Sequence, residues 1–384
     1  MVRLKVSLRD RVRIAAVCRS WRSLASRHPA EPTVPLLLIS PPHKSVGPMS
    51  ERLYNPEDGG RFYFNVPWDL WYKRIVGSYD GGWIAAIGNH KLVIKNLFSD
   101  TAATLQLKTG FDFQVCKIVF SEAPTSSNCI LAAITTNRLN IAMYRVGRPD
   151  GGWTSTRGPS MEELTDIAFC GEELYGLCGD NFEASDCVSK ERTMLKLFKF
   201  DIGVNDDGAP MVIGAQQLGE QFDIGMRDSV NMWMPIRERK KQIRGSYIVD
   251  LHGKPSIAVV AKWQHDLGPF FKVFFLVSDD HDDYMWEEVM SLGDYALFVS
   301  PTCSKAVEAG GHMKGNTVYY SCHRGYSGSS KLRAGDGDEV ERIGSVGLYV
   351  GNGPLGSMWL LRPAELSINN RTACTIYLDI HAIG

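Results

Sequence analysis

The sequence predicts an all-β protein, a β-propeller of six or seven blades preceded by one short N-terminal helix. Short runs rich in β-branched and aromatic residues recur from about residue 52 onward, separated by Gly, Asp, Asn and Ser. No long helical pattern lies between these runs, which excludes a sheet built from βαβ units. The runs form groups of about four strands every 40–60 residues, roughly the size of a propeller blade. A large β-sandwich is the alternative architecture.

Composition narrows the class of protein. The 384 residues are 44% apolar and 22% charged, with a formal net charge of -1. Such a chain can bury a sizeable core, and its balanced charge argues against a disordered or polyanion-binding protein as a whole. It has no run of 18 apolar residues, so we expect no membrane span. Nine scattered cysteines without a CxxC pair, and no secretory apolar stretch, predict reduced thiols and a cytoplasmic or nuclear location, or both.

The most helical stretch of the chain lies near its N-terminus. Apolar residues there are spaced 3, 1, 3, 3 and 1 positions apart, which places them on one face of a helix. These residues are Ile14, Val17, Cys18, Trp21, Leu24 and Ala25. Asp10 is placed to cap the first turn, and His28 and Pro29 end the helix. Because one amphipathic helix cannot bury its apolar face alone, we expect it to pack against a partner.

Residues 29–50 contain six prolines and are expected to form an extended linker. Within this segment, PLLLI at 35–39 is a candidate first strand. The propeller-like domain is then expected to span residues 51–384.

Strand patterns fill most of that domain. The expected strands are 61–64, 74–79, 83–87, 92–97, 103–107, 115–120, 129–135, 139–146, 166–170, 173–178, 194–200, 246–251, 256–263, 271–277, 284–290, 295–299, 317–322, 347–350 and 358–361. Two hairpins are predicted, one across the three-residue turn 136–138 and one across the two-residue turn 171–172. The best internal repeat is YDGGW at 79–83 with DGGW at 150–153, and the two need not occupy equivalent positions in a blade.

The N-terminal helix resembles the last helix of an F-box. Residues 9–27, RDRVRIAAVCRSWRSLASR, follow the pattern R-x-x-x-V-C-[KR]-x-W-[RK]-x-[LA]. The matching positions are Val17, Cys18, Arg19, Trp21, Arg22 and Leu24. The resemblance covers only the final third of an F-box, because MVRLKVSLRDR does not match the opening L-P-x-[DE]-L step. Residues 5–28 are therefore expected to be a partial F-box, truncated at its N-terminus.

The rest of the chain resembles the plant F-box-associated family of domain of unknown function 295, also called the KIB-type β-propeller. Similar segments begin with GSYDGGW at 77–83 and include KGNTVYYSC at 314–322. The most specific part carries Trp286, Glu288, Leu292, Gly293, Asp294, Ala296, Leu297, Phe298 and Cys303. Residues 324–384 do not follow the family pattern and are expected to be divergent. The resemblance implies a kelch-like propeller.

The same resemblance implies a non-catalytic function. An F-box docks on a Skp-type adaptor of a cullin–RING ubiquitin ligase, and the propeller of the family is thought to select the target protein. The residues implied in adaptor binding are Val17, Cys18, Trp21 and Leu24. The leading hypothesis is a substrate-recognition subunit of a Skp-cullin-F-box ligase, with an unknown target protein and with no nucleic acid, membrane or cofactor.

Other hypotheses stay open for the N-terminal helix. It is a remnant that lies on the propeller, or it is a transit peptide, since it is rich in Arg and poor in acids. If the incomplete F-box does not bind an adaptor, the propeller is an interaction module uncoupled from ubiquitination. An enzyme with its site in the propeller channel is a third hypothesis, which no motif supports.

Candidate chemical motifs are better explained as structure. Gly351–Gly356 matches GxGxxG but lacks the following helix, and the acidic runs at 279–283 and 336–341 lack EF-hand spacing. Cys303, His312, Cys322 and His323 fit no zinc framework. The basic run 237–244 is expected to be an exposed loop, with a nuclear-import signal as the alternative. Glu287 and Glu288 share a strand and face opposite ways, so they cannot act as a catalytic pair.

Overall fold

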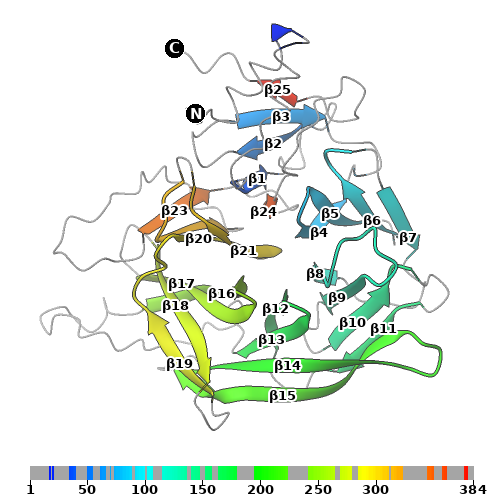
Figure 1. Cartoon of the computed structure of the whole chain (residues 1–384), viewed down its shortest axis with the longest axis vertical. Coiled ribbons are helices and arrows are strands. Elements are labelled where there is room, and N and C mark those ends of the chain that lie inside the picture. Colours follow the sequence, from blue (N-terminus) through cyan, green and yellow to red (C-terminus); the bar gives the residue numbers. More distant parts are fainter. Residues whose placement is uncertain are drawn as a thin grey trace, which may run out of the picture.

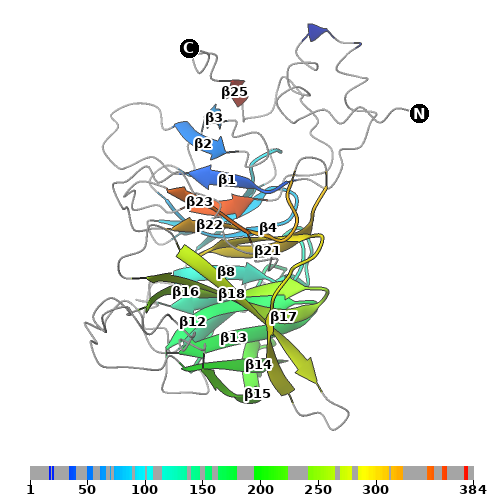
Figure 2. The same cartoon turned by 90° about the vertical axis from the view of Figure 1, so that its left-hand side faces the viewer.

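The structure, a computed structural model, describes most of the propeller strands. The described residues are 17–18, 20, 34–39, 50–54, 61–65, 70, 73–88, 91–99, 102–106, 115–135, 140–147, 152–157, 163–179, 194–223, 241–263, 269–278, 284–310, 313–322, 344–349, 357–360 and 376–378. Their strands form six sheets arranged around a central axis (Figure 1). In the side view, most strands run across the thin dimension of the molecule (Figure 2). Among the described residues, no helix is long and apolar enough to cross a membrane.

Four blades have the same antiparallel order, with the first strand of each innermost (Figure 1). Blade 1 consists of β4 (Arg74–Tyr79), β5 (Trp83–Gly88), β6 (Lys91–Asn96) and β7 (Ala102–Gln106). Blade 2 consists of β8 (Val115–Phe120), β9 (Ile130–Thr135), β10 (Asn140–Arg145) and β11 (Thr154–Arg157). Blade 3 consists of β12 (Leu164–Cys170), β13 (Glu173–Gly179), β14 (Met194–Val204) and β15 (Pro210–Asp223). Blade 4 consists of β16 (Lys241–Leu251), β17 (Lys254–Trp263), β18 (Pro269–Ser278) and β19 (Tyr284–Val289).

Blade 5 has a different strand order. It consists of β20 (Tyr295–Ser300), β21 (Cys303–Glu308), β22 (Thr317–Cys322) and β23 (Gly344–Tyr349). The order across the sheet is β21-β20-β22-β23, so the second strand in the chain is the inner one. β22 pairs in parallel with both β20 and β23. β21 is thus the innermost strand of blade 5, and it also contacts β16 of blade 4.

The sixth sheet, which we name the closing sheet, joins strands from both ends of the chain. It consists of β24 (Ser357–Leu360), β1 (Leu36–Ile39), β2 (Ser50–Tyr54), β3 (Arg61–Asn65) and β25 (Ile376–Leu378), in that order. β24 packs against β4 of blade 1 and against β20 and β21 of blade 5. The ring is therefore closed by antiparallel pairing of β1 with β24, two strands more than 300 residues apart.

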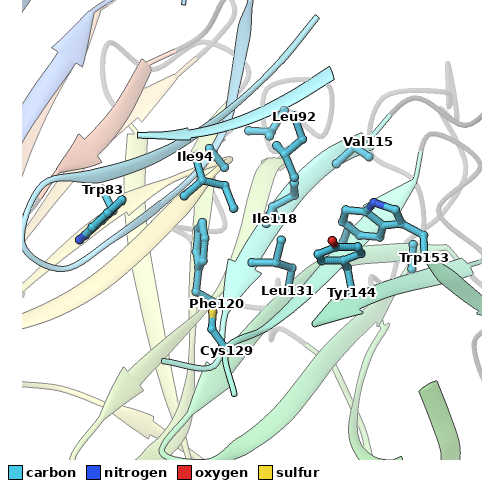
Figure 3. Close-up of a cluster of buried hydrophobic side chains, with 14 residues drawn as sticks. Trp83, Leu92, Ile94, Val115, Ile118, Phe120, Cys129, Leu131, Tyr144 and Trp153 are labelled. Carbon is cyan, nitrogen blue, oxygen red and sulfur yellow. The ribbon is translucent and has the colours of Figure 1, made fainter. Parts of the chain in front are cut away.

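The core lies between blades. One cluster joins blades 1 and 2 and includes Trp83, Ile118, Leu131 and Trp153 (Figure 3). Because the middle strands have another sheet on both sides, they bury both faces and read as continuous apolar runs, such as WIAAI and ILAAIT. The alanines in these runs are fully buried, and their small size lets neighbouring blades pack closely.

The predicted β-propeller is confirmed, and the sandwich alternative is excluded. The predicted number of blades, six or seven, is wrong, because the described residues form five four-stranded blades and a five-stranded closing sheet. Long strands account for the difference: β14 has 11 residues and β15 has 14, so blade 3 uses more chain than an average blade.

Within the expected linker at 29–50, the structure describes residues 34–39 and 50. Residues 36–39 form β1, and the candidate strand PLLLI is thereby confirmed. Leu36, Leu37 and Leu38 are 3%, 0% and 1% exposed. The run becomes a strand because the closing sheet offers it two paired neighbours and an apolar site against blade 5. Beyond residue 324, the segment expected to be divergent contributes β23, β24 and β25.

The two copies of the internal repeat occupy different positions in their blades. Residues 79–83 link the first and second strands of blade 1, whereas Gly152 and Trp153 precede the fourth strand of blade 2. Gly81, Gly82 and Gly152 all have positive φ, at 83°, 91° and 63°, which explains the shared glycines.

Gly77 marks the closest approach of two inner strands. A Cβ added there would lie 2.2 Å from the carbonyl oxygen of Ile118 in β8, and this contact is with backbone that cannot rotate away. We expect Gly77→Ala to lower the free energy of unfolding by about 1–3 kcal/mol, because blades 1 and 2 must move apart. Urea unfolding followed by tryptophan fluorescence measures the change, and an unaltered midpoint would contradict this packing.

Candidate binding face

The adaptor-binding residues predicted from the sequence are only partly described. Val17 is 66% exposed, and Cys18 is exposed. Val17 and Ser20 have helical backbone, but the described residues here are too few to define a helix. Trp21 and Leu24 lie outside the described residues, so their role stays a prediction.

The inner strands of blades 1 and 2 run in the same direction. At their starts, the guanidinium of Arg74 in β4 donates to the carbonyl oxygen of Val115 in β8. At their ends, the rings of Tyr79 and Phe120 lie with centroids 5.9 Å apart. The two strands are therefore aligned start to start and end to end.

The inner strands of blades 3 and 4 show the same alignment. The hydroxyl of Ser246 in β16 donates to that of Thr165 in β12 at 3.4 Å. Further along, the N–H of Gly171 donates to the Oδ2 atom of Asp250 at 3.2 Å. Since each of blades 1 to 4 contains four antiparallel strands, every new blade starts from the same side of the ring.

Blade 5 keeps this direction although its inner strand is the second in the chain. Cys303 in β21 is hydrogen-bonded to Ser78 in β4, and two residues later Lys305 forms an ion pair with Asp80. β21 therefore runs parallel to β4. We name the side of the ring at which β4, β8, β12, β16 and β21 end the exit face.

Short turns and one longer loop make up the exit face. Its described residues after the inner strands and around blade 5 are 80–82, 121–129, 171–172, 252–253, 291–295, 309–310 and 313–316. The described turns between third and fourth strands, 97–99, 146–147, 152–153 and 205–209, lie on the same face. The β16–β17 turn is tight, with His252 at φ 57° and Gly253 at φ 76°. The longer loop is fixed at its base, where the N–H of Ile130 donates to the Ser121 hydroxyl at 2.9 Å. Such a surface of loops on a rigid ring is the usual kind of protein-binding surface.

Contacts between turns join neighbouring blades on this face. Asp250 accepts the N–H of Gly253 at 2.8 Å through Oδ1, besides the bond to Gly171 of blade 3. The ring of His252 in blade 4 meets the ring of Tyr295 in blade 5 edge to face, with centroids 4.6 Å apart. These contacts hold the turns of blades 3, 4 and 5 in fixed relative positions.

A charged and aromatic group lies where blade 5 meets blade 1. The Lys305 ammonium lies 2.7 Å from the Oδ1 atom of Asp80 and 5.9 Å from the ring centroid of Tyr79. The two charged side chains are 31% and 54% exposed, so solvent reaches both. Burial and the neighbouring Asp80 raise the pKa of Tyr79. Burial lowers the pKa of Lys305, but Asp80 and Cys303 raise it by more, so the lysine stays charged.

A buried ion pair joins three blades below this surface. The Lys117 ammonium in β8 lies 2.5 Å from the Oδ1 atom of Asp166 in β12, and the two side chains are 5% and 2% exposed. The other oxygen of Asp166 accepts the N–H of Ile248 in β16 at 2.8 Å. Burial raises the pKa of Asp166, while Lys117 and the N–H of Ile248 oppose that rise. The pair fixes the relative positions of blades 2, 3 and 4.

Of these four charged residues, Lys117, Asp166 and Lys305 stand in no sequence motif, whereas Asp80 belongs to YDGGW. The available signal was a lone charge inside an apolar strand, as in VCKIVF around Lys117 and LTDIAFC around Asp166. A buried charge in such a run requires a partner. Which partner it has depends on the order of the blades around the ring, and a single sequence does not encode that order locally.

Three buried cysteines among the described residues have a raised thiol pKa and are therefore expected to react slowly. Burial raises the pKa of Cys129 to about 11 and also raises the pKa of Cys170 and of Cys303. Among the described cysteines, we expect iodoacetamide at pH 8 to modify the exposed Cys18 before these three thiols, which stay intact until the protein unfolds because burial raises their pKa and keeps them protonated. Mass spectrometry of the digested protein gives the order, and early alkylation of Cys170 or Cys303 would contradict it.

No group of metal-ligating side chains occurs among the described residues. Most chemical motifs considered above lie outside those residues, including 279–283, 336–341, His312, His323 and 351–356. Glu288 is described and forms an ion pair with Lys272 at 2.8 Å. Cys303 is buried and hydrogen-bonded to Ser78, so its side chain is part of the packing between β21 and β4.

Comparison with known proteins agrees with this architecture. The family model described as the KIB1-4 beta-propeller matches residues 53–349. An Arabidopsis thaliana protein named "Putative F-box protein At5g60060" is 36% identical over 81 residues, which span 21% of this chain and 21% of that relative. The chain thus matches about a fifth of the length of this curated relative.

Solved structures give more distant likenesses. A chain of the yeast heterotrimeric Nup82-Nup159-Nup116 nucleoporin complex is 10% identical, with a TM-score of 0.32 over 71% of this chain and 74% of that chain. An oligogalacturonate lyase from Vibrio parahaemolyticus is 11% identical, with a TM-score of 0.30 over 63% of this chain and 72% of that chain. Likenesses at this level have no bearing on function.

Proposed function

The chain belongs to the KIB1-4 β-propeller family, and we propose that it is a substrate-recognition subunit of a Skp-cullin-F-box ubiquitin ligase. In this proposal the N-terminal helical segment binds a Skp-type adaptor and the exit face of the propeller binds the target protein. The observation that carries it is the combination of the VCRSWRSL pattern with a family propeller in one chain. The F-box name of the Arabidopsis relative supports it.

The proposed subunit is not an enzyme. Its partners supply the chemistry of ubiquitin transfer, and the propeller supplies specificity through loops on a rigid scaffold. The exit face suits this role because its turns are joined by Asp250 and by the His252–Tyr295 contact, which keeps the surface organised before a partner arrives. The proposed location is the cytoplasm, the nucleus or both.

A second function is favoured by one observation. The family model matches residues 53–349, which hold the propeller, and does not extend to the F-box-like pattern at residues 9–27. In this alternative the propeller binds its protein partner without recruiting a ligase.

Adaptor capture tests the proposal. We expect the intact chain to retain a Skp-type adaptor in a pull-down, and the double variant Trp21→Ala, Leu24→Ala to lose at least about 30-fold in affinity, since the loss of even one buried anchor costs about 2 kcal/mol or more. The double variant Ser23→Ala, Ser26→Ala changes the opposite face of the expected helix and is the matched control. Capture that survives the Trp21 and Leu24 changes, or no capture by the intact chain, would refute the ligase proposal for this polypeptide.

A further inference from the structure

The hairpin of β14 and β15 forms the outer end of blade 3 and projects from the ring (Figure 1). Its turn, residues 205–209, lies on the exit face. The backbone N–H of Ala209 donates to the Oδ1 atom of Asn205 at 2.8 Å, and the backbone N–H of Asn205 donates to the Ala209 carbonyl oxygen at 2.9 Å. The Thr154 hydroxyl in β11 donates to the carbonyl oxygen of Pro210 at 2.5 Å. The end of the hairpin is therefore held in one shape and tied to blade 2.

A β-bulge in β15 turns an isoleucine out to solvent. Ile202 pairs with Val212, and the next pair along the hairpin is Asp201 with Gly214. Ile213 is therefore an extra residue, without a pairing partner in β14, a strand whose residues are all described. Val212 packs in the core between blades 2 and 3 and is 7% exposed, whereas Ile213 is 65% exposed. Because a bulge re-aims a side chain in this way, the exposure of Ile213 is built into the strand.

Ile213 is part of a small surface patch. Gly203 pairs with Met211, and a Cβ added to Gly203 would lie 2.8 Å from the Cγ2 atom of Ile213. Ile213 and Met211 therefore lie beside Gly203 on one face of the hairpin. Asp201 is two residues before Gly203 in β14 and shares that face. We name these four residues, Asp201, Gly203, Met211 and Ile213, the blade 3 patch.

The surroundings of the blade 3 patch are acidic. Residues 200–220 contain four acids and no Lys, Arg or His. Lys199, which comes just before them, forms an ion pair with Glu173. All four acids are exposed: Asp201, Asp206, Asp207 and Glu220. An apolar centre inside a negatively charged surface complements a ligand that carries an apolar group beside positive charges.

Charge decides which kind of molecule binds the patch. Nucleic acids and anionic membrane surfaces are negatively charged, so the four acids repel them. A second copy of this chain would place the same acids against one another in a two-fold contact. Pairing of two copies along β15 is also disfavoured, because bulges interrupt this outer strand at two places. A polypeptide segment with Lys or Arg beside an apolar side chain matches both the charge and the apolar centre.

We propose that the blade 3 patch binds a segment of a partner protein in which Lys or Arg residues flank a large apolar side chain. The apolar side chain packs on Ile213 and Met211, and the basic side chains face Asp201 and the acids of the turn. Since the hairpin end is already fixed, binding orders little of this chain. That the partner is the ubiquitination target rests on the proposed function, whereas the patch and its ligand chemistry do not.

Peptide selection on the full chain tests the proposal. A phage-displayed library of random dodecapeptides is selected on the immobilised protein, and the enriched peptides are synthesised and titrated by fluorescence anisotropy at low and high salt. Ile213→Ser removes the apolar centre, and Asp207→Asn removes one charge. The matched controls are Met290→Ser, at a side chain 61% exposed after β19, and Glu308→Gln, at an exposed acid of blade 5.

We expect the enriched peptides to carry a net positive charge and at least one large apolar residue. Ile213→Ser should weaken their binding by about tenfold or more, because the apolar contact is lost. Asp207→Asn should weaken binding about threefold at low salt and less at high salt, since salt screens exposed charges. The two controls should change affinity by less than about twofold. No enriched binders, neutral or acidic binders, or equal losses in patch and control variants would overturn the proposal.

Two further measurements separate this proposal from the ligase proposal and from self-association. Ile213→Ser should capture a Skp-type adaptor as well as the intact chain does, because the patch is remote in sequence from the F-box-like pattern. If the intact chain captures no adaptor but selects basic peptides through Ile213, the ligase proposal fails and the patch stands. If capture persists and the selection fails, the patch alone is overturned. A dimer in light scattering that Ile213→Ser dissociates would make a second copy the ligand and overturn the proposal.

Discussion

Replacing Asp166 by alanine is expected to lower the free energy of unfolding by about 3–5 kcal/mol. The change leaves the Lys117 ammonium, with its side chain 5% exposed, without its counter-charge. It also removes the acceptor of the Ile248 N–H, so three inner strands lose a shared contact at once. The shift of the urea midpoint at constant slope measures the loss.

Two control variants show whether the loss of stability comes from the burial of the ion pair or from the loss of a charge alone. Glu173→Ala breaks the ion pair with Lys199, whose side chains are 46% and 31% exposed, and should cost less than about 1 kcal/mol. Adding Lys117→Met to Asp166→Ala removes the unpaired buried charge and should restore part of the stability. Equal small losses for Asp166→Ala and Glu173→Ala would show that the buried pair does not join the blades.

Replacing Phe298 by alanine is expected to cost about 3–5 kcal/mol, the range for a large aromatic side chain in a core. Phe298 is 0% exposed, and its ring stacks on Tyr319 with centroids 4.7 Å apart and planes 5° from parallel. The same cluster holds Leu37 of β1 in the closing sheet and Val34 just before that strand. The cavity should therefore loosen the ring closure as well as blade 5.

Hydrogen exchange and urea unfolding together test this second expectation. Exchange of the backbone amides at 36–39 should become faster in Phe298→Ala, whereas amides in β9 of blade 2 should change only through global stability. Phe298→Leu keeps most of the volume and should cost less than the alanine change. A loss below about 1 kcal/mol, with unchanged exchange at 36–39, would contradict the proposed coupling.

Most strands could be predicted from the local sequence pattern, because a strand that is buried on both faces is apolar at nearly every position. The runs WIAAI, ILAAIT and ELYGLC are apolar at nearly every position, and each is a strand with blades on both sides. The two predicted hairpins are confirmed by antiparallel pairing of β9 with β10 and of β12 with β13. Turn chemistry at Gly171, with φ 59°, explains the second of these.

The strands that were not predicted from the sequence have weaker apolar patterns. β15 carries many polar residues because it is the outer strand of blade 3, and β21 (CSKAVE) mixes polar and small residues beside the axis, with no regular apolar pattern. β21 nevertheless supplies Lys305, the charged residue that connects blade 5 to blade 1. An inner strand with polar side chains meets partners from other blades, which a local apolar pattern cannot show.

The sequence by itself determined that this protein is all-β, that its strands group by fours into a propeller, and that a basic amphipathic segment precedes it. These features follow from periodicity and composition, which act over a few residues. Only the tertiary structure decided how many blades form, that β1 pairs with β24, and that Lys117 meets Asp166. Ring closure and blade order join residues that lie far apart in the chain, so no local pattern reveals them.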